Sequence, residues 1–427
     1  MIYNTMNNLS KTDKEMSFLK KTVSKLIMLN IGVFRFFSNR RLSFKIFAVL
    51  CVVYAFVLYK SRRRKVTKIY KKTKTNKEVV DHLRTLIKAF WPTFYLPTAI
   101  SMIVFGMVRN RYSFTFEKQF ITLPDKGEIL CEWFPANFAD MDPKTPIVVF
   151  NYGLAGSSQE FYSQELCQLI KEKGWRMVIV NRRGFGFSEL KNKNFMQKEE
   201  IKDLKYVVST IHDVFQLATM YMIGISAGAN FSSCYMGSVK EKTPVRAYVS
   251  ISNPFNLGRI SFTMRYKITA GLISKGFAAS IKGLYKQHQN NPHFQNLLKR
   301  NFSNYSRVNL QIKNANDVWE LDKNVTRKLG GFDHVLEYYR KTSSEHFIDY
   351  IKRPTLFINN AEDPICIKET IPIEKIYDNE NCVLLINDRG GHVEYFSGWK
   401  ADWWGFKTAL AYFDYFEKRG DGFIFEA

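Results

Sequence analysis

Cysteine pairs of the kind that bind metals or cross-link small domains are missing from this sequence. None of its six cysteines stands in C-x-x-C spacing, and one lies inside an apolar run. In a chain of 427 residues this pattern excludes a disulfide framework and a zinc site, and it favours a reducing compartment. No other pattern implies a metal or an organic cofactor, so we expect none. The cysteines are Cys51, Cys131, Cys167, Cys234, Cys366 and Cys382.

Acidic residues are scarce in the first 90 residues, which contain 21 Lys/Arg but only 4 Asp/Glu. The remaining 337 residues carry 42 Lys/Arg and 35 Asp/Glu, so most of the formal net charge of +24 belongs to an N-terminal arm. A nucleic-acid-binding domain concentrates its positive charge on its folded part. The distribution therefore argues against a nucleic-acid partner and favours a segment that lies beside a membrane.

Long uninterrupted apolar runs are also absent, and this bears on membrane insertion. The run Ile46–Tyr59 has 14 residues, about 21 Å as a helix, which is too short for a bilayer core of about 30 Å. Starting at Leu42, with Lys45 reaching the headgroups, gives 18 residues or about 27 Å, so we predict a transmembrane helix over residues 42–59. Ten Lys/Arg follow between Lys60 and Lys77, and the positive-inside rule therefore places the C-terminal side in the cytoplasm.

A second apolar stretch, Ala89–Val108, is 20 residues long but contains Pro92 and Pro97. Two prolines interrupt the helical hydrogen bonds that a lipid environment demands. We therefore expect this stretch to pack on the main domain, which leaves a single-pass protein with a cytosolic domain. The alternative, a second span here, would move the main domain to the lumen.

From Lys118 onward the sequence alternates between short apolar runs typical of buried strands and longer stretches typical of helices, after a first hairpin over 119–134. This alternation predicts an α/β fold with a mostly parallel, eight-stranded sheet and helices on both faces. It stops between Pro254 and Pro354, so we expect an inserted helical cap over residues 254–353. The arm is predicted to be 1–88 and the main domain 89–427. The expected buried strands are 147–150, 177–180, 220–225, 247–251, 355–358 and 383–386.

The clearest chemical signal is Gly224-Ile225-Ser226-Ala227-Gly228, which fits G-x-S-x-G between an expected strand and an expected helix. A serine on such a sharp turn projects its hydroxyl from the edge of the sheet, and the glycines remove side chains that would collide there. The N-terminus of the following helix favours developing negative charge. We predict that Ser226 is a nucleophile; the alternative is a chance match in an ordinary turn.

A serine nucleophile needs a base and an acid that orients the base, in the chain order Ser, acid, His for this motif. Among the seven histidines, only His392 follows the last expected strand, in the glycine loop 388–392. Asp363 and Glu362 both stand just beyond the expected strand 355–358, where such an acid belongs, and we favour Asp363. The alternative is that both acids are ordinary solvated loop residues.

Two backbone N–H groups are needed to bind the oxyanion that forms when a serine attacks an ester. The first is expected from Ala227, directly after the nucleophile. The second is expected from the glycine-rich loop 151–158, with Leu154 as the donor. A plain glycine turn is the alternative for this loop.

These motifs occur in the same order in a known family. From about Phe90 to the C-terminus, the sequence resembles the membrane-anchored α/β-hydrolase-domain (ABHD) lipases and esterases, in the branch with types one and three. Gly224–Asn230, Ala361–Pro364 and Gly390–His392 are similar to its G-x-S-M-G-A-N, DDP and GGH motifs. The resemblance implies the α/β-hydrolase fold and a triad of Ser226, Asp363 and His392.

Three further segments, 92–97, 153–158 and 181–186, resemble the PT-x-W-type, HGLTGSS and NNRG blocks of the same family. Tyr152 stands where the family has a histidine, and Ala227 stands where it has a methionine. The backbone donors of the oxyanion site do not depend on these side chains. The family contains monoacylglycerol lipases, phospholipases and alcohol acyltransferases, so the resemblance implies acyl-ester chemistry on lipids.

The predicted function is hydrolysis of lipid acyl esters, of monoacylglycerol or phospholipid type, by a membrane-anchored serine hydrolase. The expected partners are the lipid substrate and the membrane. One alternative is an acyltransferase that uses the same triad and an alcohol in place of water. Another is a non-catalytic protein that retains the fold.

Overall fold

The computed structural model describes residues 45–51, 53, 65–109, 112–154, 156–186, 188–192, 194–195 and 200–419. The chain divides into two units, Met1–Arg63 and Arg64–Ala427. In the first unit residues 45–51 are helical, and most of the transmembrane helix predicted over 42–59 lies outside the described residues. Within the described ranges, the helices are too short or too polar to cross a bilayer.

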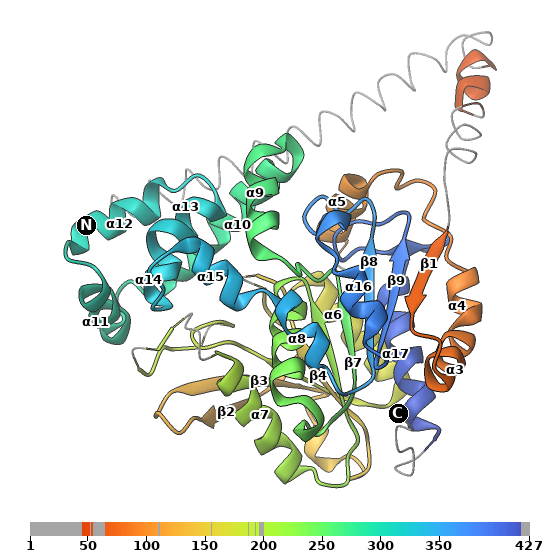
Figure 1. Cartoon of the computed structure of the whole chain (residues 1–427), viewed down its shortest axis with the longest axis horizontal. Coiled ribbons are helices and arrows are strands. Elements are labelled where there is room, and N and C mark those ends of the chain that lie inside the picture. The colour runs from red at the N-terminus through yellow and green to blue at the C-terminus, as the bar shows by residue number, and fades with distance from the viewer. Residues whose placement is uncertain are drawn as a thin grey trace. The chain divides into compact units, whose positions relative to one another are not determined.

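The second unit is built on a twisted sheet of nine strands in the order β1-β9-β8-β7-β6-β4-β5-β3-β2 (Figure 1). The six strands from β9 to β5 run parallel, while β1, β3 and β2 pair antiparallel with their neighbours. The predicted mostly parallel α/β sheet is therefore confirmed, with nine strands rather than eight. The strands are β1 (Val66–Tyr70), β2 (Glu117–Thr122), β3 (Glu128–Phe134), β4 (Ile147–Asn151), β5 (Arg176–Val180), β6 (Met220–Ile225), β7 (Val245–Ile251), β8 (Thr355–Asn360) and β9 (Cys382–Asn387).

The ninth strand, β1, corrects the domain boundary expected at residue 88. β1 pairs with β9 from Val66 opposite Asn387 to Tyr70 opposite Val383. The following helix α3 (Lys74–His82) is tied to the domain as well, because buried Asn76 donates its side-chain amide to the carbonyl oxygen of Glu380 at 2.8 Å. The lysine-rich composition concealed this strand, since lysines are common on edge strands, where they discourage pairing with other chains.

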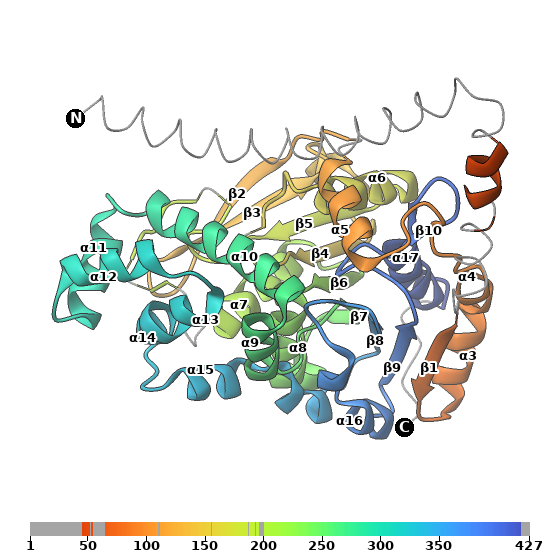
Figure 2. The same ribbon diagram turned by 90° about the horizontal axis from the view of Figure 1, so that it is seen from above.

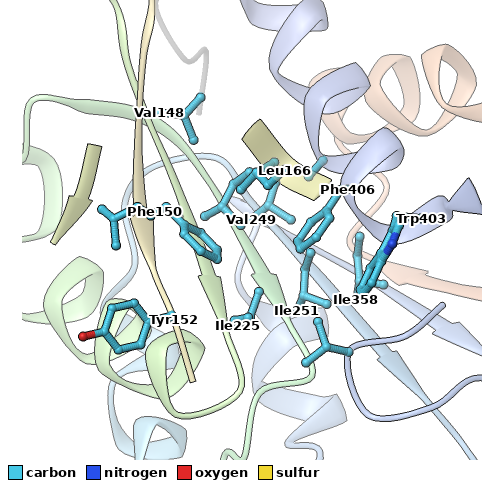
Figure 3. Close-up of a cluster of buried hydrophobic side chains, with 14 of the residues drawn as sticks. Val148, Phe150, Tyr152, Leu166, Ile225, Val249, Ile251, Ile358, Trp403 and Phe406 are labelled. Atoms are coloured by element: carbon cyan, nitrogen blue, oxygen red, sulfur yellow. The ribbon is translucent and has the colours of Figure 1, made fainter. Parts of the chain in front are cut away.

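Helices cover both faces of the sheet because alternate residues of each central strand point to opposite sides. Val148 and Phe150 of β4 join a core with α6 (Phe161–Lys173) and α17 (Trp404–Glu417), which Figure 3 shows. Ile147 and Val149 of the same strand join a second core with α7 (Glu200–Val214), α8 (Ala227–Val239) and α16 (Ile373–Asp378). These two buried cores fix the strands whose ends carry the candidate site.

A run of helices fills the interval between β7 and β8, which Figures 1 and 2 show in green to teal beside the sheet. A π-helical turn, Asp322–Thr326, lies within it. Short 3₁₀ turns, among them Ser344–His346 and Ile348–Tyr350, lead back into the sheet at β8. The helices are α9 (Leu257–Tyr266), α10 (Ile268–Gln287), α11 (Pro292–Asn301), α12 (Tyr305–Asn314), α13 (Val318–Leu321), α14 (Arg327–Leu329) and α15 (Val335–Thr342).

The apolar stretch 89–108 is only partly helical. Helix α4 (Arg84–Lys88) precedes it, and helix α5 (Ala99–Val108) begins after Pro97, with Thr98 and Ser101 forming a capping box. Met102 and Gly106 of α5 are buried in the second unit, as expected for a segment that packs on the main domain. The opposite side of α5 is exposed, which the sequence did not predict. A small two-stranded ribbon, β10 (Phe396–Ser397) and β11 (Asp402–Trp403), completes this part of the unit.

The order of the strands creates a crevice at one end of the sheet. The chain passes from β4 through α6 to β5 on one side, and then through α7 to β6 on the other side of β4. The connections that follow the carboxyl ends of β4 and β6 therefore diverge, and ligands in open α/β sheets bind at such a point.

Candidate active site

Ser226 occupies the turn between β6 and α8 with φ of 51° and ψ of −125°. Positive φ values are uncommon for residues other than glycine, and such strain concentrates at functional sites. The turn is packed tightly on both sides. A Cβ atom at Gly228 would lie 2.2 Å from the carbonyl oxygen of Asn151, and one at Gly224 would lie 2.8 Å from the Cα of Ala229. Both glycines are thus required by close packing, as the G-x-S-x-G pattern predicted.

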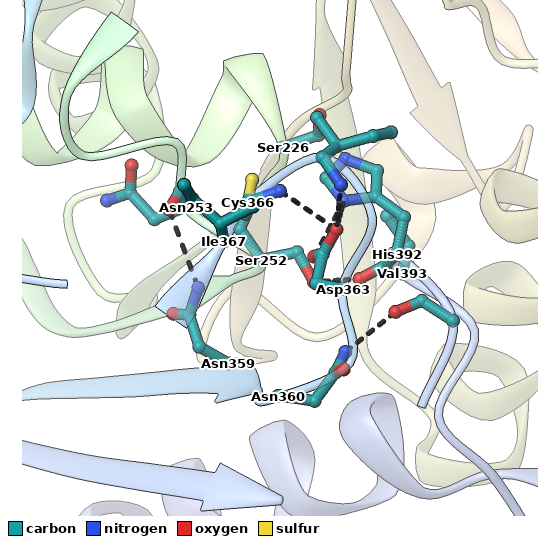
Figure 4. A network of polar contacts seen from close by, with 12 residues as sticks. Ser226, Ser252, Asn253, Asn359, Asn360, Asp363, Cys366, Ile367, His392 and Val393 are labelled. Atoms are coloured by element: carbon teal, nitrogen blue, oxygen red, sulfur yellow. Dashed lines mark hydrogen bonds and ion pairs between the residues drawn. The ribbon is translucent and has the colours of Figure 1, made fainter. Parts of the chain in front are cut away.

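The structure brings Ser226, His392 and Asp363 together in one hydrogen-bonded chain (Figure 4). The Oγ of Ser226 lies 2.6 Å from Nε2 of His392, and Nδ1 of His392 lies 2.9 Å and 3.1 Å from the two carboxylate oxygens of Asp363. The backbone N–H groups of Ile365 and Cys366 donate to Oδ1 of Asp363 at 2.8 Å and 2.9 Å. These donors fix the position of the carboxylate beside the imidazole.

Glu362, the other acid considered for this position, points away from His392. Its carboxylate forms a 2.6 Å ion pair with Arg389. The adjacent Asn360, at the end of β8, donates its side-chain amide to the carbonyl oxygen of Gly391 at 2.6 Å. This bond joins the loop that carries Asp363 to the loop that carries His392. It holds the two loops in positions at which Asp363, and not Glu362, lies beside the imidazole.

The surroundings of His392 raise its pKa, so the imidazole binds a proton more readily than it would in water. Burial alone lowers the pKa of His392, but the charge of Asp363, its hydrogen bond and the nearby Glu394 together raise it above its usual value. Glu394 is itself buried, and its carboxylate accepts the backbone N–H groups of His392 and Val393 at 3.1 Å each. Burial raises the pKa of Glu394, while His392 and the backbone donors oppose that rise.

Two residues that support His392, Ser252 and Glu394, were not predicted from the sequence. Ser252 adopts φ of 53° just after β7, and its hydroxyl donates to the carbonyl oxygen of His392. Glu394 holds the backbone of the same loop, as described above. An acid inside the otherwise apolar stretch after the glycine loop was a usable signal for Glu394. Ser252 carried no such signal, because its contact joins residues 140 positions apart.

The expected oxyanion donors lie beside Ser226. Leu154 and Ala227 line the same cavity as Ser226. The loop after β4 approaches closely, since a Cβ at Gly153 would lie 3.3 Å from the Cβ of Ser226. Tyr152 is buried here, and its hydroxyl donates to the side-chain oxygen of Asn181 at 2.7 Å. Tyr152 therefore holds the loop in place through a side-chain hydrogen bond.

A cavity of about 200 Å³ opens onto Ser226 between the sheet and the helices that follow β7. Its wall is mostly apolar on the side of α9 and α10, where Ile260, Met264, Phe277 and Ile281 line it. An apolar wall of this kind suits an acyl chain, because such a chain gains free energy when it leaves water.

Polar side chains also line the cavity. Arg182 and Glu200 lie 3.6 Å apart in an ion pair. Asp322, in the π-helical turn, accepts a hydrogen bond from the hydroxyl of Tyr339 at 2.8 Å, and burial raises the pKa of Asp322 to about 6. π-helical turns are frequent at functional sites. The cavity can therefore hold a molecule with an apolar part and a polar part.

A metal ion does not fit the donor set at this site. Asp363, Cys366 and His392 present ligand atoms within 4.8 Å of one another. Each of these atoms already has a hydrogen-bonding partner, and the Cys366 thiol donates to the carbonyl oxygen of Ser252. Burial raises the pKa of Cys366 well above its usual value, which keeps the thiol protonated. A metal needs the deprotonated thiolate, so the donors favour the Ser–His–Asp chain.

Known proteins share this architecture. A family model described as alpha/beta hydrolase fold matches residues 146–374, more than half of the chain. An abhydrolase domain-containing protein of Dictyostelium discoideum is 28% identical over 333 residues, which cover 77% of this chain and 81% of that protein. Phospholipase ABHD3 of Homo sapiens is 23% identical over 352 residues, with coverages of 81% and 83%. A monoacylglycerol lipase of Saccharomyces cerevisiae is 26% identical over 313 residues, with coverages of 71% and 62%.

The nine-stranded sheet, the serine turn after β6 and the sequence relatives all indicate the same family. The chain belongs to the alpha/beta hydrolase fold family, within its ABHD proteins, and is a carboxylic ester hydrolase.

Proposed function

We propose that this protein hydrolyses acyl esters of lipids, with Ser226 as the nucleophile, His392 as the base and Asp363 as the residue that orients the base. The observation that carries the proposal is the chain of short contacts from Ser226 Oγ through His392 to Asp363, at 2.6 Å and 2.9 Å. Such a chain activates a hydroxyl that is otherwise a weak nucleophile.

In the first half of the reaction, Ser226 Oγ attacks the ester carbonyl carbon while its proton passes to Nε2 of His392. The negative charge of Asp363 stabilises the imidazolium that forms. His392 then gives the proton to the oxygen of the leaving alcohol as the carbon–oxygen bond breaks. In the second half, a water molecule gives one proton to Nε2 of His392 and attacks the acyl carbon. The bond between that carbon and Ser226 Oγ then breaks, His392 returns the proton to Oγ, and the fatty acid leaves.

The N–H groups of Leu154 and Ala227 are proposed to bind the oxyanion in both halves of the reaction. Ala227 is the first residue of α8, so its N–H points out of the start of the helix and has no partner within it. Loss of one such donor lowers the rate by about 10²–10³. The positions of both residues beside Ser226 support this role.

A lipid substrate is supported by the mixed lining of the cavity and by the relatives. The apolar side chains of α9 and α10 contact the acyl chain, and polar side chains such as Arg182 and Asp322 bind the glycerol or phosphate part. The similar human protein is named a phospholipase and the similar yeast protein a monoacylglycerol lipase. Both names fit an ester whose acyl chain and polar part lie on opposite sides of the reacting carbonyl.

The direct test is hydrolysis of a radiolabelled monoacylglycerol and a radiolabelled phospholipid by the full-length protein and by Ser226→Ala. We expect the variant to lose activity by about 10⁴-fold or more, because the nucleophile is gone. Ser209→Ala, on α7, is the control and should retain the wild-type rate. Equal rates for Ser226→Ala and the wild type would refute the proposal.

A further inference from the structure

The first part of the cap carries a large excess of positive charge. Residues 254–316 contain ten Lys/Arg and no Asp/Glu. Since the residues after 90 have a net charge of +7, this short stretch accounts for all of it and leaves −3 for the others. The ten are Arg259, Arg265, Lys267, Lys275, Lys282, Lys286, Lys299, Arg300, Arg307 and Lys313.

Helices α9 and α10 form a hairpin around Lys267, which we call the cap hairpin, and it has two apolar faces. Its inner face lines the cavity above Ser226, as described above. On its outer face, Phe262, Tyr266 and Leu272 are 60%, 66% and 66% exposed, and the rings of Phe262 and Tyr266 lie 4.5 Å apart. Three exposed aromatic and aliphatic side chains on one hairpin are costly in water unless something covers them.

The exposed apolar side chains of the hairpin alternate with cations. Arg259 of α9, Lys267 between the two helices and Lys275 of α10 are all exposed. Aromatic and aliphatic side chains beside Lys and Arg, without acids, are typical of helices that lie in the headgroup region of a membrane. The hairpin therefore combines apolar insertion with attraction to negative charge.

A second apolar surface, the α5 patch, lies at the same end of the sheet. Figure 1 shows α5 and the cap hairpin above the same end of the sheet. Helix α5 contains no charged residue, and its outer side chains are exposed. Phe94 stacks on Trp399 at 5.0 Å between ring centres beside it. The patch consists of Phe94, Ile100, Val104, Met107, Val108 and Trp399.

The α5 patch is close to the reacting groups. Gly106, on the inner side of α5, packs so closely on Glu394 that a Cβ there would lie 2.8 Å from its Cγ. Glu394 in turn accepts the backbone N–H of His392. The α5 patch and the cap hairpin thus lie on either side of the candidate active site.

We propose that the cap hairpin and the α5 patch form one surface that lies on a bilayer containing anionic lipid. Phe262, Tyr266 and Leu272 enter the boundary between headgroups and acyl chains, and Lys267 and Lys275 bind the negative headgroups. A second copy of the chain is a poor occupant, because it would set the exposed Arg259, Lys267 and Lys275 of one copy against the same cations of the other. The cap hairpin is then the layer between the bilayer and the cavity, because its inner face lines that cavity. A lipid ester therefore reaches Ser226 by passing the hairpin, a step that rests on the proposed function.

The first test compares activity on vesicles with activity on a soluble ester. Lys267→Glu/Lys275→Glu is expected to slow hydrolysis of a lipid ester in phosphatidylserine-containing vesicles by about tenfold, because two attractions become repulsions. Hydrolysis of a water-soluble short-chain ester should stay at the wild-type rate. The matched control is Lys144→Glu/Lys352→Glu, two exposed lysines before β4 and β8 at the opposite end of the sheet, and it should match the wild type in both assays.

Failure of this proposal is distinguishable from failure of the proposed function. If the function is wrong, Ser226→Ala leaves both activities unchanged. If only the membrane surface is wrong, Ser226→Ala abolishes both activities, while Lys267→Glu/Lys275→Glu hydrolyses anionic vesicles as fast as the control variant does.

The second test measures insertion without using activity. Leu272→Cys in a Cys51→Ser background is labelled with a polarity-sensitive fluorophore in the full-length protein; the five other cysteines are buried. We expect a blue shift on phosphatidylserine-containing vesicles and quenching by lipids brominated near the headgroup. A fluorophore at Lys144→Cys should show neither effect. A label at Leu272→Cys that remains in water on these vesicles overturns the proposal and leaves a protein partner as the occupant.

Discussion

His392 is held by groups that come from four separate loops, and this explains how one imidazole can serve two proton transfers. Asp363 binds one ring nitrogen, and Ser226 lies at the other. Ser252 and Glu394 hold the backbone of the histidine loop. Since the ring is fixed on both edges, it can accept a proton from Ser226 and return it without reorientation.

Replacement of Asp363 tests its role through the pH dependence of the rate. The raised pKa of His392 means that the base is protonated, and the enzyme inactive, below that raised value. Asp363→Asn removes the largest of the effects that raise this pKa, so the acidic limb of kcat/KM should move to lower pH. The maximal rate should fall by about 10⁴-fold, because the ring can adopt the wrong tautomer.

Glu362→Gln is the matched control for Asp363→Asn, since Glu362 binds Arg389 and not His392. It should keep both the wild-type rate and the wild-type pH profile. If the acidic limb stays in place in Asp363→Asn, then Asp363 does not control the charge of His392.

The residues of the Ser–His–Asp chain could be predicted because each follows a strand end that the sequence makes visible. Ser226 stands in a glycine pattern, His392 in a glycine loop and Asp363 just after an apolar run. The choice between Asp363 and Glu362 depended on a long-range bond, Asn360 to Gly391, that no local pattern displays. Ser252 was missed for the same reason.

Strand β1 and helix α3 determine where the folded domain begins. β1 covers the edge of β9, and the Asp388 N–H donates to the carbonyl oxygen of Lys65 at 3.0 Å. The hydroxyl of Tyr415, in the last helix, donates to Glu78 of α3 at 2.8 Å. The N-terminal part of the second unit is thus bonded both to the sheet, through β1, and to α17, through α3.

Two truncated chains test whether these elements belong to the domain. A chain that begins at Lys65 should fold and hydrolyse a soluble short-chain ester at the wild-type rate. A chain that begins at Ala89 exposes the edge of β9 and the buried Val79 and Val80 contacts, so it should aggregate or melt at a clearly lower temperature. Thermal unfolding of both provides the measurement, and equal melting temperatures would show that β1 and α3 are dispensable.

The central strands could be predicted from the sequence because burial on both faces makes them continuous apolar runs. β6 was predicted at its observed bounds, and β4 and β9 within one residue at each end. β1 was missed because an edge strand needs few apolar residues, and Lys68 lies in its middle. The exposed face of α5 was missed because an apolar sequence does not tell which side is covered.

In the whole molecule, excess positive charge is concentrated in two segments of the sequence, the N-terminal arm and the first part of the cap. We propose that residues 42–59 anchor the chain and that the second unit lies on the cytosolic side. The ten Lys/Arg between Lys60 and Lys77 support this orientation, since cations remain on the cytoplasmic side of a single span. The basic first part of the cap would then face the anionic leaflet.

Protease treatment of sealed microsomes tests this topology. With the second unit on the cytosolic side, trypsin should digest it without detergent, while a lumenal marker protein stays intact. A second unit that resists trypsin until detergent is added would place it in the lumen and contradict the proposal.

Ser226 is proposed to be the activated nucleophile of a serine hydrolase. Labelling of the full-length protein by a fluorophosphonate, with mass spectrometry of the modified peptide, probes this nucleophile itself. We predict one adduct, on Ser226, whose formation slows sharply in His392→Ala and is absent in Ser226→Ala. An adduct on another residue, or labelling that persists unchanged in Ser226→Ala, would show that Ser226 is not the nucleophile.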